Sequence, residues 1–169
     1  LAALLAARTS GQGQVIDAAM VDGVASLMTM HMGYLQAGFW KLDRESNAVD
    51  GGSPYYRTYV CRDGKYIAVG AVEKRFYLEF VTGLGLDPTS MPKQNDRSQW
   101  EELAGIFAAE FLKRDRDDWA GHFAATDACV SPVLDMDESA RHPLAVERTM
   151  SRHADGVSAP RPAPRFSLT

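Results

Sequence analysis

The sequence has 169 residues, of which 46% are hydrophobic and 24% are charged, and its formal net charge is −4. This apolar content is enough to bury a core, and the acidic balance provides no basic surface that could follow a phosphate backbone, so nucleic acid is not expected as a partner. No run of residues reaches the roughly 18 apolar positions of a membrane-spanning helix, so no membrane partner is expected either.

The first residues predict a helix, a turn, a strand and a second helix. Residues 1–8 are rich in leucine and alanine, which is typical of the end of a buried helix. A glycine-rich turn at 11–14 leads into the apolar run 15–19, which predicts a short buried strand. Apolar positions then recur at three- and four-residue steps, which predicts a helix from Met20 to Leu35. Because no initiator methionine opens the sequence, we expect it to be the central and C-terminal part of a longer chain.

The remaining sequence predicts helices and short strands. A polar segment at 38–54 has the composition of an exposed loop. The β-rich runs 57–62 and 65–69 flank Asp63-Gly64, which predicts a hairpin closed by a type I′ turn. The elements expected after the hairpin are helices over 73–82, 97–113 and 116–124, an edge or kinked strand over 128–134, and an extended proline-rich tail after Met150.

Two cysteines, Cys61 and Cys129, stand far apart in the sequence. Two isolated thiols do not make a disulfide framework, and both are of the kind usually buried as small apolar side chains. This cysteine content favours a reducing compartment, and we therefore expect a cytoplasmic protein.

The first candidate for chemistry is Asp17, near the end of the predicted strand. A carboxylate beside an apolar strand is costly to bury unless it is paired or used, and at a strand end it can meet a ligand in a crevice. The simpler interpretation is that Asp17 caps the helix that follows. The residues alone leave both interpretations open.

The second candidate is Glu73, which stands where the hairpin strand joins the next helix. An acid at this junction can serve a site at the strand end, or it can simply interact favourably with the helix dipole. A third feature is the set of methionines that includes Met20 and Met28. Methionine adapts to irregular apolar shapes, so these residues could bind a flexible acyl chain or could pack in the core.

Taken together, these segments resemble the family III CoA-transferases, and in particular their α-methylacyl-CoA racemase branch. Residues 11–23 are similar to the family signature around a catalytic aspartate. The segments that resemble the racemase branch are Gly51-Gly52-Ser53-Pro54-Tyr55-Tyr56, Tyr59, Asp63-Gly64, Tyr66, Ala68-Val69-Gly70-Ala71, Glu73, Phe76-Tyr77, Gly83-Leu84-Gly85-Leu86, the run 127–134 and Pro162-Ala163-Pro164-Arg165-Phe166.

The resemblance implies an α/β architecture with a small α+β domain, in an interlocked homodimer. Residues 1–50 would hold the end of a large Rossmann-like, CoA-binding domain and a linker helix. Residues 51–150 would form the small domain, and residues 151–169 would be an extended tail that returns toward the large domain.

The reaction that the resemblance implies is inversion at C2 of a 2-methylacyl-CoA thioester through an enolate, a step of fatty acid and lipid metabolism. It needs two acid/base groups and no metal or redox cofactor, because coenzyme A is part of the substrate. Asp17 would be one of the two groups, Glu73 would support the other, and the other is a histidine expected upstream of Leu1. Substrate-binding residues would be Met20, Met28, Tyr55 and Tyr59.

Two alternatives remain at this stage. In a CoA-transferase, Asp17 would be a nucleophile that forms an acyl anhydride and then an aspartyl-CoA thioester. Such enzymes resemble one another in a longer glycine run before the hairpin, whereas this sequence has only Gly51-Gly52, which favours the racemase. The third interpretation is a non-catalytic dimerisation or structural part of a larger protein.

Overall fold

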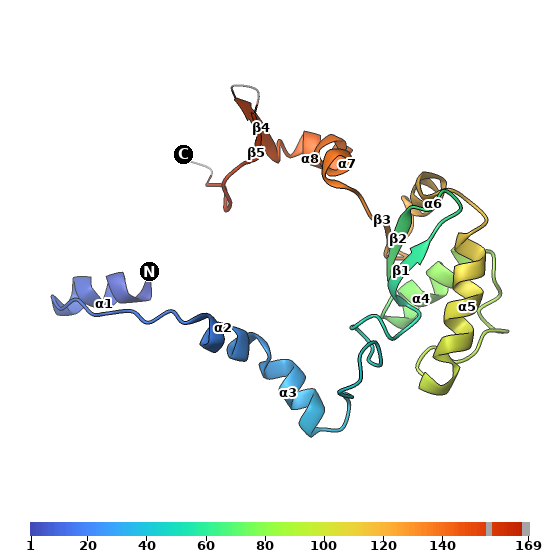
Figure 1. Ribbon diagram of the computed structural model, residues 1–169, viewed down its shortest axis with the longest axis horizontal. Coiled ribbons are helices and arrows are strands. Elements are labelled where there is room, and N and C mark those ends of the chain that lie inside the picture. Colours follow the sequence, from blue (N-terminus) through green and yellow to red (C-terminus); the bar gives the residue numbers. More distant parts are fainter. Residues whose placement is uncertain (155–156, 167–169) are drawn as a thin grey trace. The chain divides into compact units, whose positions relative to one another are not determined.

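The computed structural model describes residues 1–154 and 157–166, and it divides the chain into two compact units, 1–47 and 48–169 (Figure 1). The first unit contains α1 (Ala2–Ser10), α2 (Met20–Leu27) and α3 (Thr29–Gln36). Gly11 ends α1 in the left-handed conformation, with φ of 71°, and its N–H donates to the Ala7 carbonyl. None of these three helices contains a buried residue, so the prediction of a buried first helix is wrong for this chain.

Two other predictions for the first unit need correction. Residues 15–19 form no strand, because a strand needs a neighbour for its N–H and C=O groups and none of the described strands pairs with them. The expected helix over 20–35 is divided at Met28, where the Thr29 hydroxyl donates to the Ser26 carbonyl at 2.7 Å. The division is slight, since the Met28 N–H still donates to the Val24 carbonyl.

The second unit is built on a three-stranded antiparallel sheet in the order β1 (Tyr56–Val60), β2 (Tyr66–Gly70) and β3 (Val130–Pro132). The predicted hairpin is confirmed, but its turn is not of type I′. The Cys61 N–H donates to the Lys65 carbonyl and the Gly64 N–H to the Cys61 carbonyl, and within this loop only Gly64 has positive φ. This is a type I turn followed by a left-handed glycine, the common three-residue hairpin loop.

Four helical segments complete the body of this unit (Figure 1). They are α4 (Lys74–Gly83), the short 3₁₀ helix η1 (Arg97–Gln99), α5 (Trp100–Phe111) and α6 (Arg116–Phe123). Every second residue of β2 is buried on the side of the sheet that faces these helices, as Ile67 and Val69 show. The largest buried side chains of the resulting core are aromatic: Tyr55, Tyr59, Tyr77, Phe80, Trp100, Phe107, Phe111, Trp119 and Phe123.

β3 lies at the edge of the sheet, as its proline predicted. Pro132 is paired with Ile67 of β2, and no described strand lies on the other side of β3, so the missing N–H of the proline costs no hydrogen bond between strands. The sheet face opposite the helices carries Tyr56, Val60 and Tyr66, which are between 41% and 50% exposed. One face of the sheet therefore forms the core and the other remains accessible in this chain.

Two short helices, α7 (Met136–Arg141) and α8 (Pro143–Glu147), follow β3 within the range predicted for the small domain. The predicted tail, 151–169, is not wholly extended without pairing, because it begins with an antiparallel pair, β4 (Ser151–Ala154) with β5 (Val157–Pro160). Residues 161–166 contain no helix or strand, as their prolines predict, and the end of the expected tail, 167–169, lies outside the described residues. The division of the chain into parts at 50 and 150 stays a prediction.

A cluster of charges fastens α7 to the body of the second unit. Arg116, only 3% exposed, donates to both carboxylate oxygens of Glu138, at 2.6 and 2.9 Å. Lys65 Nζ and the Asp135 N–H donate to the same carboxylate, at 2.7 and 3.1 Å. These hydrogen bonds, those from Arg116 most of all, hold the pKa of Glu138 far below its usual range.

This cluster predicts a pH dependence of stability. Glu138 takes up a proton less readily in the folded than in the unfolded chain, so its contribution is present above the usual glutamate pKa of about 4.3 and is lost as the pH falls through the lower folded value. We expect the free energy of unfolding of Glu138→Gln to change less than that of the wild type between about pH 6 and about pH 3. Urea unfolding at several pH values measures this difference.

The matched control is Glu147→Gln, an exposed glutamate of α8 that forms no ion pair among the described residues. It should retain the pH dependence of the wild type. Equal pH slopes for the wild type, Glu138→Gln and Glu147→Gln would show that the cluster does not govern acid stability.

Candidate functional site

Glu73 is exposed and occupies the N-cap position of α4, with φ of −73° and ψ of 143°. Its side chain forms no capping hydrogen bond, whereas its carbonyl accepts the Tyr77 N–H at 2.9 Å. The backbone of Glu73 thus begins the helix while its carboxylate stays accessible at the end of β2. The sheet of this unit is antiparallel, and Glu73 does not line the hollow beside it, so its role in a site stays a prediction.

A side chain that the sequence did not indicate fixes this junction. Gln94 Nε2 donates to the carbonyls of Ala71 and Val72, at 3.3 and 2.8 Å. The backbone carbonyl of Gln94 in turn accepts a hydrogen bond from the indole N–H of Trp100 at 2.9 Å. Gln94 lies in an irregular segment with no periodicity, so only the tertiary structure reveals its role.

Beside this junction is a hollow of about 550 Å³, which we call the sheet-end hollow. It is bounded by the Gly51 loop, by the adjoining parts of β1 and β2 and by the start of β3. The residues that line it are Val49, Asp50, Gly51, Tyr56, Arg57, Thr58, Ala68, Val69, Gly70, Cys129 and Ser131.

The loop at its rim has a defined conformation. Gly51 has φ of 94°, which an L side chain rarely adopts, and the Gly52 N–H donates to Asp50 Oδ1 at 3.1 Å. Ser53 is fully buried, and its hydroxyl donates to the Ala48 carbonyl at 2.7 Å. The segment 38–54 has no helix or strand, as predicted, but its last residues are anchored in the interior rather than wholly exposed.

The two candidate tyrosines are core residues. Tyr55 and Tyr59 are 3% and 5% exposed. The Tyr55 hydroxyl donates to Asn95 Oδ1 at 3.3 Å, and the Tyr59 hydroxyl donates to the Pro54 carbonyl. Burial raises the pKa of both phenols. Packing and hydrogen bonding account for both side chains in this chain, and substrate binding by them stays a prediction.

Asp17, Met20 and Met28 lie in the first unit. The N-cap of α2 is Ala19, and no side chain caps that helix, so the interpretation of Asp17 as a helix cap is wrong. Asp17 is exposed in the extended segment before α2. Met20 and Met28 are 88% and 44% exposed, so neither packs in a core here. Asp17 belongs to the first unit and Glu73 to the second.

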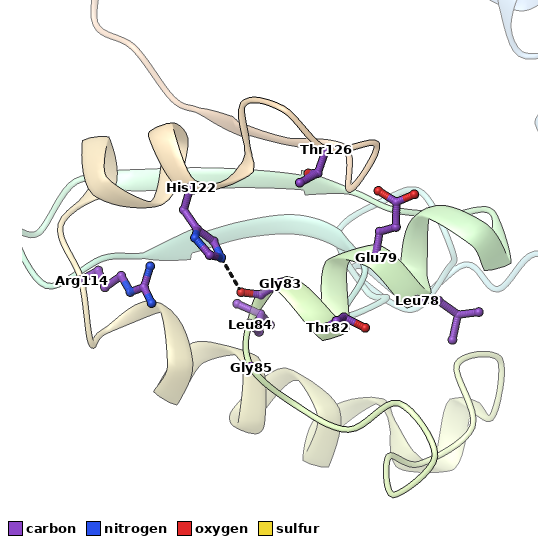
Figure 2. A pocket seen from close by; sticks show the side chains of 9 residues that line it. All are labelled: Leu78, Glu79, Thr82, Gly83, Leu84, Gly85, Arg114, His122 and Thr126. Carbon is purple, nitrogen blue, oxygen red and sulfur yellow. Dashed lines mark hydrogen bonds between the residues drawn. The ribbon is translucent and has the colours of Figure 1, made fainter.

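A second hollow, of about 570 Å³, lies at the C-terminal end of α4 (Figure 2). Figure 2 shows His122 pointing at the Gly83 carbonyl, with an Nε2–oxygen distance of 2.8 Å. Glu79 Oε2 accepts the Asp127 N–H at 2.8 Å. The side chains of His122 and Glu79 thus each form a hydrogen bond with a backbone group. None of the predicted site residues lines this hollow.

Within residues 1–154 and 157–166, no three histidine, cysteine or carboxylate side chains are grouped so that they could hold a metal ion. In the same residues, no helix is long and apolar enough to cross a membrane.

The architecture belongs to a known structural class. A crystal structure of a CAIB/BAIF family protein from Brucella suis matches 99% of this chain with a TM-score of 0.73 and 22% sequence identity, and the match covers 45% of that protein. This confirms the mixed α/β fold that the sequence predicted. The model of CoA-transferase family III matches residues 1–169, and the chain belongs to that family.

The chain is also similar to two curated proteins of the racemase branch that its sequence resembles. The chain is 42% identical over 169 residues to the alpha-methylacyl-CoA racemase of Mus musculus, covering 99% of this chain and 44% of that protein. It is 40% identical over 157 residues to the alpha-methylacyl-CoA racemase of Homo sapiens, covering 92% of this chain and 41% of that protein. The chain thus spans less than half the length of these relatives.

Proposed function

We propose that the protein carrying this sequence is a racemase that inverts C2 of 2-methylacyl-CoA thioesters. The observation that carries this proposal is the identity of 42% and 40% to two alpha-methylacyl-CoA racemases over nearly the whole chain. The accessible Glu73 carboxylate at the end of β2 supports it. The protein would act in lipid metabolism, as an interlocked homodimer in the cytoplasm, with no cofactor apart from the coenzyme A of its substrate.

The chemistry requires a base and an acid on opposite faces of C2. A base takes the C2 proton, and the electron pair of the C–H bond moves into the thioester carbonyl to give an enolate. A proton then returns to the other face, the carbonyl is restored and the centre is inverted. Asp17 is proposed as one of the two acid/base groups.

The second group in this proposal is a histidine outside these residues. The role proposed for Glu73 is to orient and charge-stabilise that histidine. The two carboxylates would thus have different roles: Asp17 would exchange a proton with the substrate, and Glu73 would act through the histidine.

The test follows the C2 proton. The full-length protein that carries this sequence is incubated with (2R)-2-methylacyl-CoA in deuterated water, and deuterium at C2 is measured together with the configuration. We expect exchange accompanied by inversion. If C2 does not exchange, and coenzyme A is instead transferred to an added carboxylate while hydroxylamine traps an adduct on Asp17, the protein is a CoA-transferase and the racemase proposal fails.

A further inference from the structure

Glu73 depends on its backbone for the direction of its side chain. Its carboxylate forms no capping hydrogen bond, and none of the ion pairs within residues 1–154 and 157–166 includes it. On the helix side, its carbonyl accepts the Tyr77 N–H at 2.9 Å. On the strand side, the Val72 N–H donates to the Gly70 carbonyl at 3.0 Å, which turns the chain sharply before the helix. The carboxylate therefore keeps a defined direction only while this turn is fixed.

Gln94 provides the hydrogen bonds that the sheet does not provide at this turn. β2 ends at Gly70, and neither β1 nor β3 pairs with the residues that follow it. The carbonyls of Ala71 and Val72 instead accept hydrogen bonds from the Gln94 side-chain amide, at 3.3 and 2.8 Å. An amide nitrogen carries two hydrogens, so it can donate to both carbonyls at once. One side chain from a distant segment thus holds the two residues that immediately precede Glu73.

Gln94 is itself held by the aromatic core. Its backbone carbonyl accepts the indole N–H of Trp100, a buried side chain at the start of α5. At the next position, Asn95 Oδ1 accepts the hydroxyl of the buried Tyr55 at 3.3 Å. The Tyr55 and Trp100 rings pack edge to face, with their centres 5.9 Å apart. The segment that carries Gln94 is therefore anchored at two successive residues, which lets its side chain act as a firm support.

We propose that Gln94 is a positioning residue, which directs the Glu73 carboxylate by holding the carbonyls of Ala71 and Val72. This inference rests on the proposed function, because it takes from there the role of Glu73 beside the acid/base histidine. A displacement of about 1 Å in a positioned group can cost a factor of about 10² in rate. The two hydrogen bonds can therefore affect catalysis without any contact between Gln94 and the substrate.

Cys129 provides a reporter of the Glu73 carboxylate that does not depend on catalysis. Its carbonyl accepts the Gly70 N–H at 2.9 Å, and its side chain is exposed, whereas the other cysteine, Cys61, is buried. The pKa of the Cys129 thiol is raised first by partial burial and then by the negative charge of Glu73. The charged groups with smaller effects on this thiol are Asp127, Arg75 and Glu79. Removing or displacing the Glu73 carboxylate should therefore lower the pKa of the thiol.

The experiment is a double-mutant cycle in the full-length protein. Gln94→Met keeps the length of the side chain but removes both donors, and it is combined with Glu73→Gln. Gln94→Asn, whose amide is one methylene shorter, is a second and milder variant. Gln99→Met is the matched control, because Gln99 lies in the same segment and its Oε1 accepts the Lys93 N–H at 3.3 Å.

Two quantities are measured for each variant. The first is the pair kcat and KM for C2 deuterium exchange, and the second is the pH dependence of Cys129 alkylation by iodoacetamide, followed by mass spectrometry of the peptide that contains it. We expect Gln94→Met to lower kcat about tenfold with little change in KM, and to lower the pKa of the thiol toward its value in Glu73→Gln. Gln94→Asn should act in the same direction, and Gln99→Met should resemble the wild type.

The cycle separates positioning from a merely structural role. If Gln94 acts through Glu73, Gln94→Met should add little to either quantity once Glu73 is glutamine. An unchanged kcat, or the same change in both backgrounds, would overturn the positioning role. Failure of the proposed function is a separate result, in which the wild type does not exchange the C2 proton. The thiol titrations then decide alone whether Gln94 positions the carboxylate.

Discussion

Replacing Asp17 with asparagine is expected to lower the rate of C2 inversion by about 10²- to 10⁴-fold, which is the range that a positioned acid or base contributes. Asparagine has nearly the same shape as aspartate but cannot exchange a proton at neutral pH. The change therefore removes one of the two acid/base groups while it preserves the exposed extended segment before α2. Deuterium exchange and inversion of (2R)- and (2S)-2-methylacyl-CoA by the full-length protein measure the effect.

The two enantiomers make this prediction sharper. If Asp17 acts on one face of C2, exchange should be lost most strongly for the enantiomer whose proton points at it, because the other base can still take its own proton. The control is Asp22→Asn, which removes a second carboxylate in the first turn of α2 and should leave inversion close to the wild-type rate. Equal losses in the two variants would point to a general effect of charge or structure instead of an acid/base role.

The sequence predicted most of the second unit because its signals are local. Alternating apolar residues and Gly64 indicate the hairpin, and α4 begins and ends within one residue of its prediction. The turn type was missed because the choice depends on which backbone groups bond across the loop, and composition does not fix that choice. The predicted strand over 15–19 failed for a related reason: an apolar run specifies a strand only where a neighbouring strand accepts its hydrogen bonds.

The candidate site was predictable only in part. Glu73 stood out because an acid at a strand–helix junction is visible in the sequence itself. Gln94 did not stand out, since its position becomes meaningful only when distant segments meet: it lies 22 residues from the Val72 carbonyl to which its side chain donates. Tyr55 and Tyr59 show the converse. Their place in the resemblance suggested a ligand, whereas an aromatic core surrounds them in this chain.

Replacing Gly83 with alanine is expected to destabilise the second unit by about 1–3 kcal/mol, the usual cost of forcing extra volume into a packed core. A Cβ atom at Gly83 would lie 2.2 Å from Cε1 and 2.9 Å from Cζ of Phe123. The Phe123 ring is 3% exposed and stacks on Trp119, with ring centres 5.8 Å apart, so it has little room to move. The better helix propensity of alanine, worth about 1 kcal/mol, offsets only part of this cost.

Gly105→Ala is the control, because Gly105 is also a helical glycine, inside α5, and a Cβ atom there would meet nothing within 4 Å, whereas Gly83 is the last residue of α4. This change should stabilise the protein by about 0.5–1 kcal/mol. Urea unfolding followed by tryptophan fluorescence suits the comparison, since Trp119 packs against the affected ring. The two alanine variants should therefore shift the unfolding midpoint in opposite directions. A shift of the same sign and size in both would mean that helix propensity decides the outcome, and that the contact between α4 and α6 through Gly83 and Phe123 is looser than the structure shows.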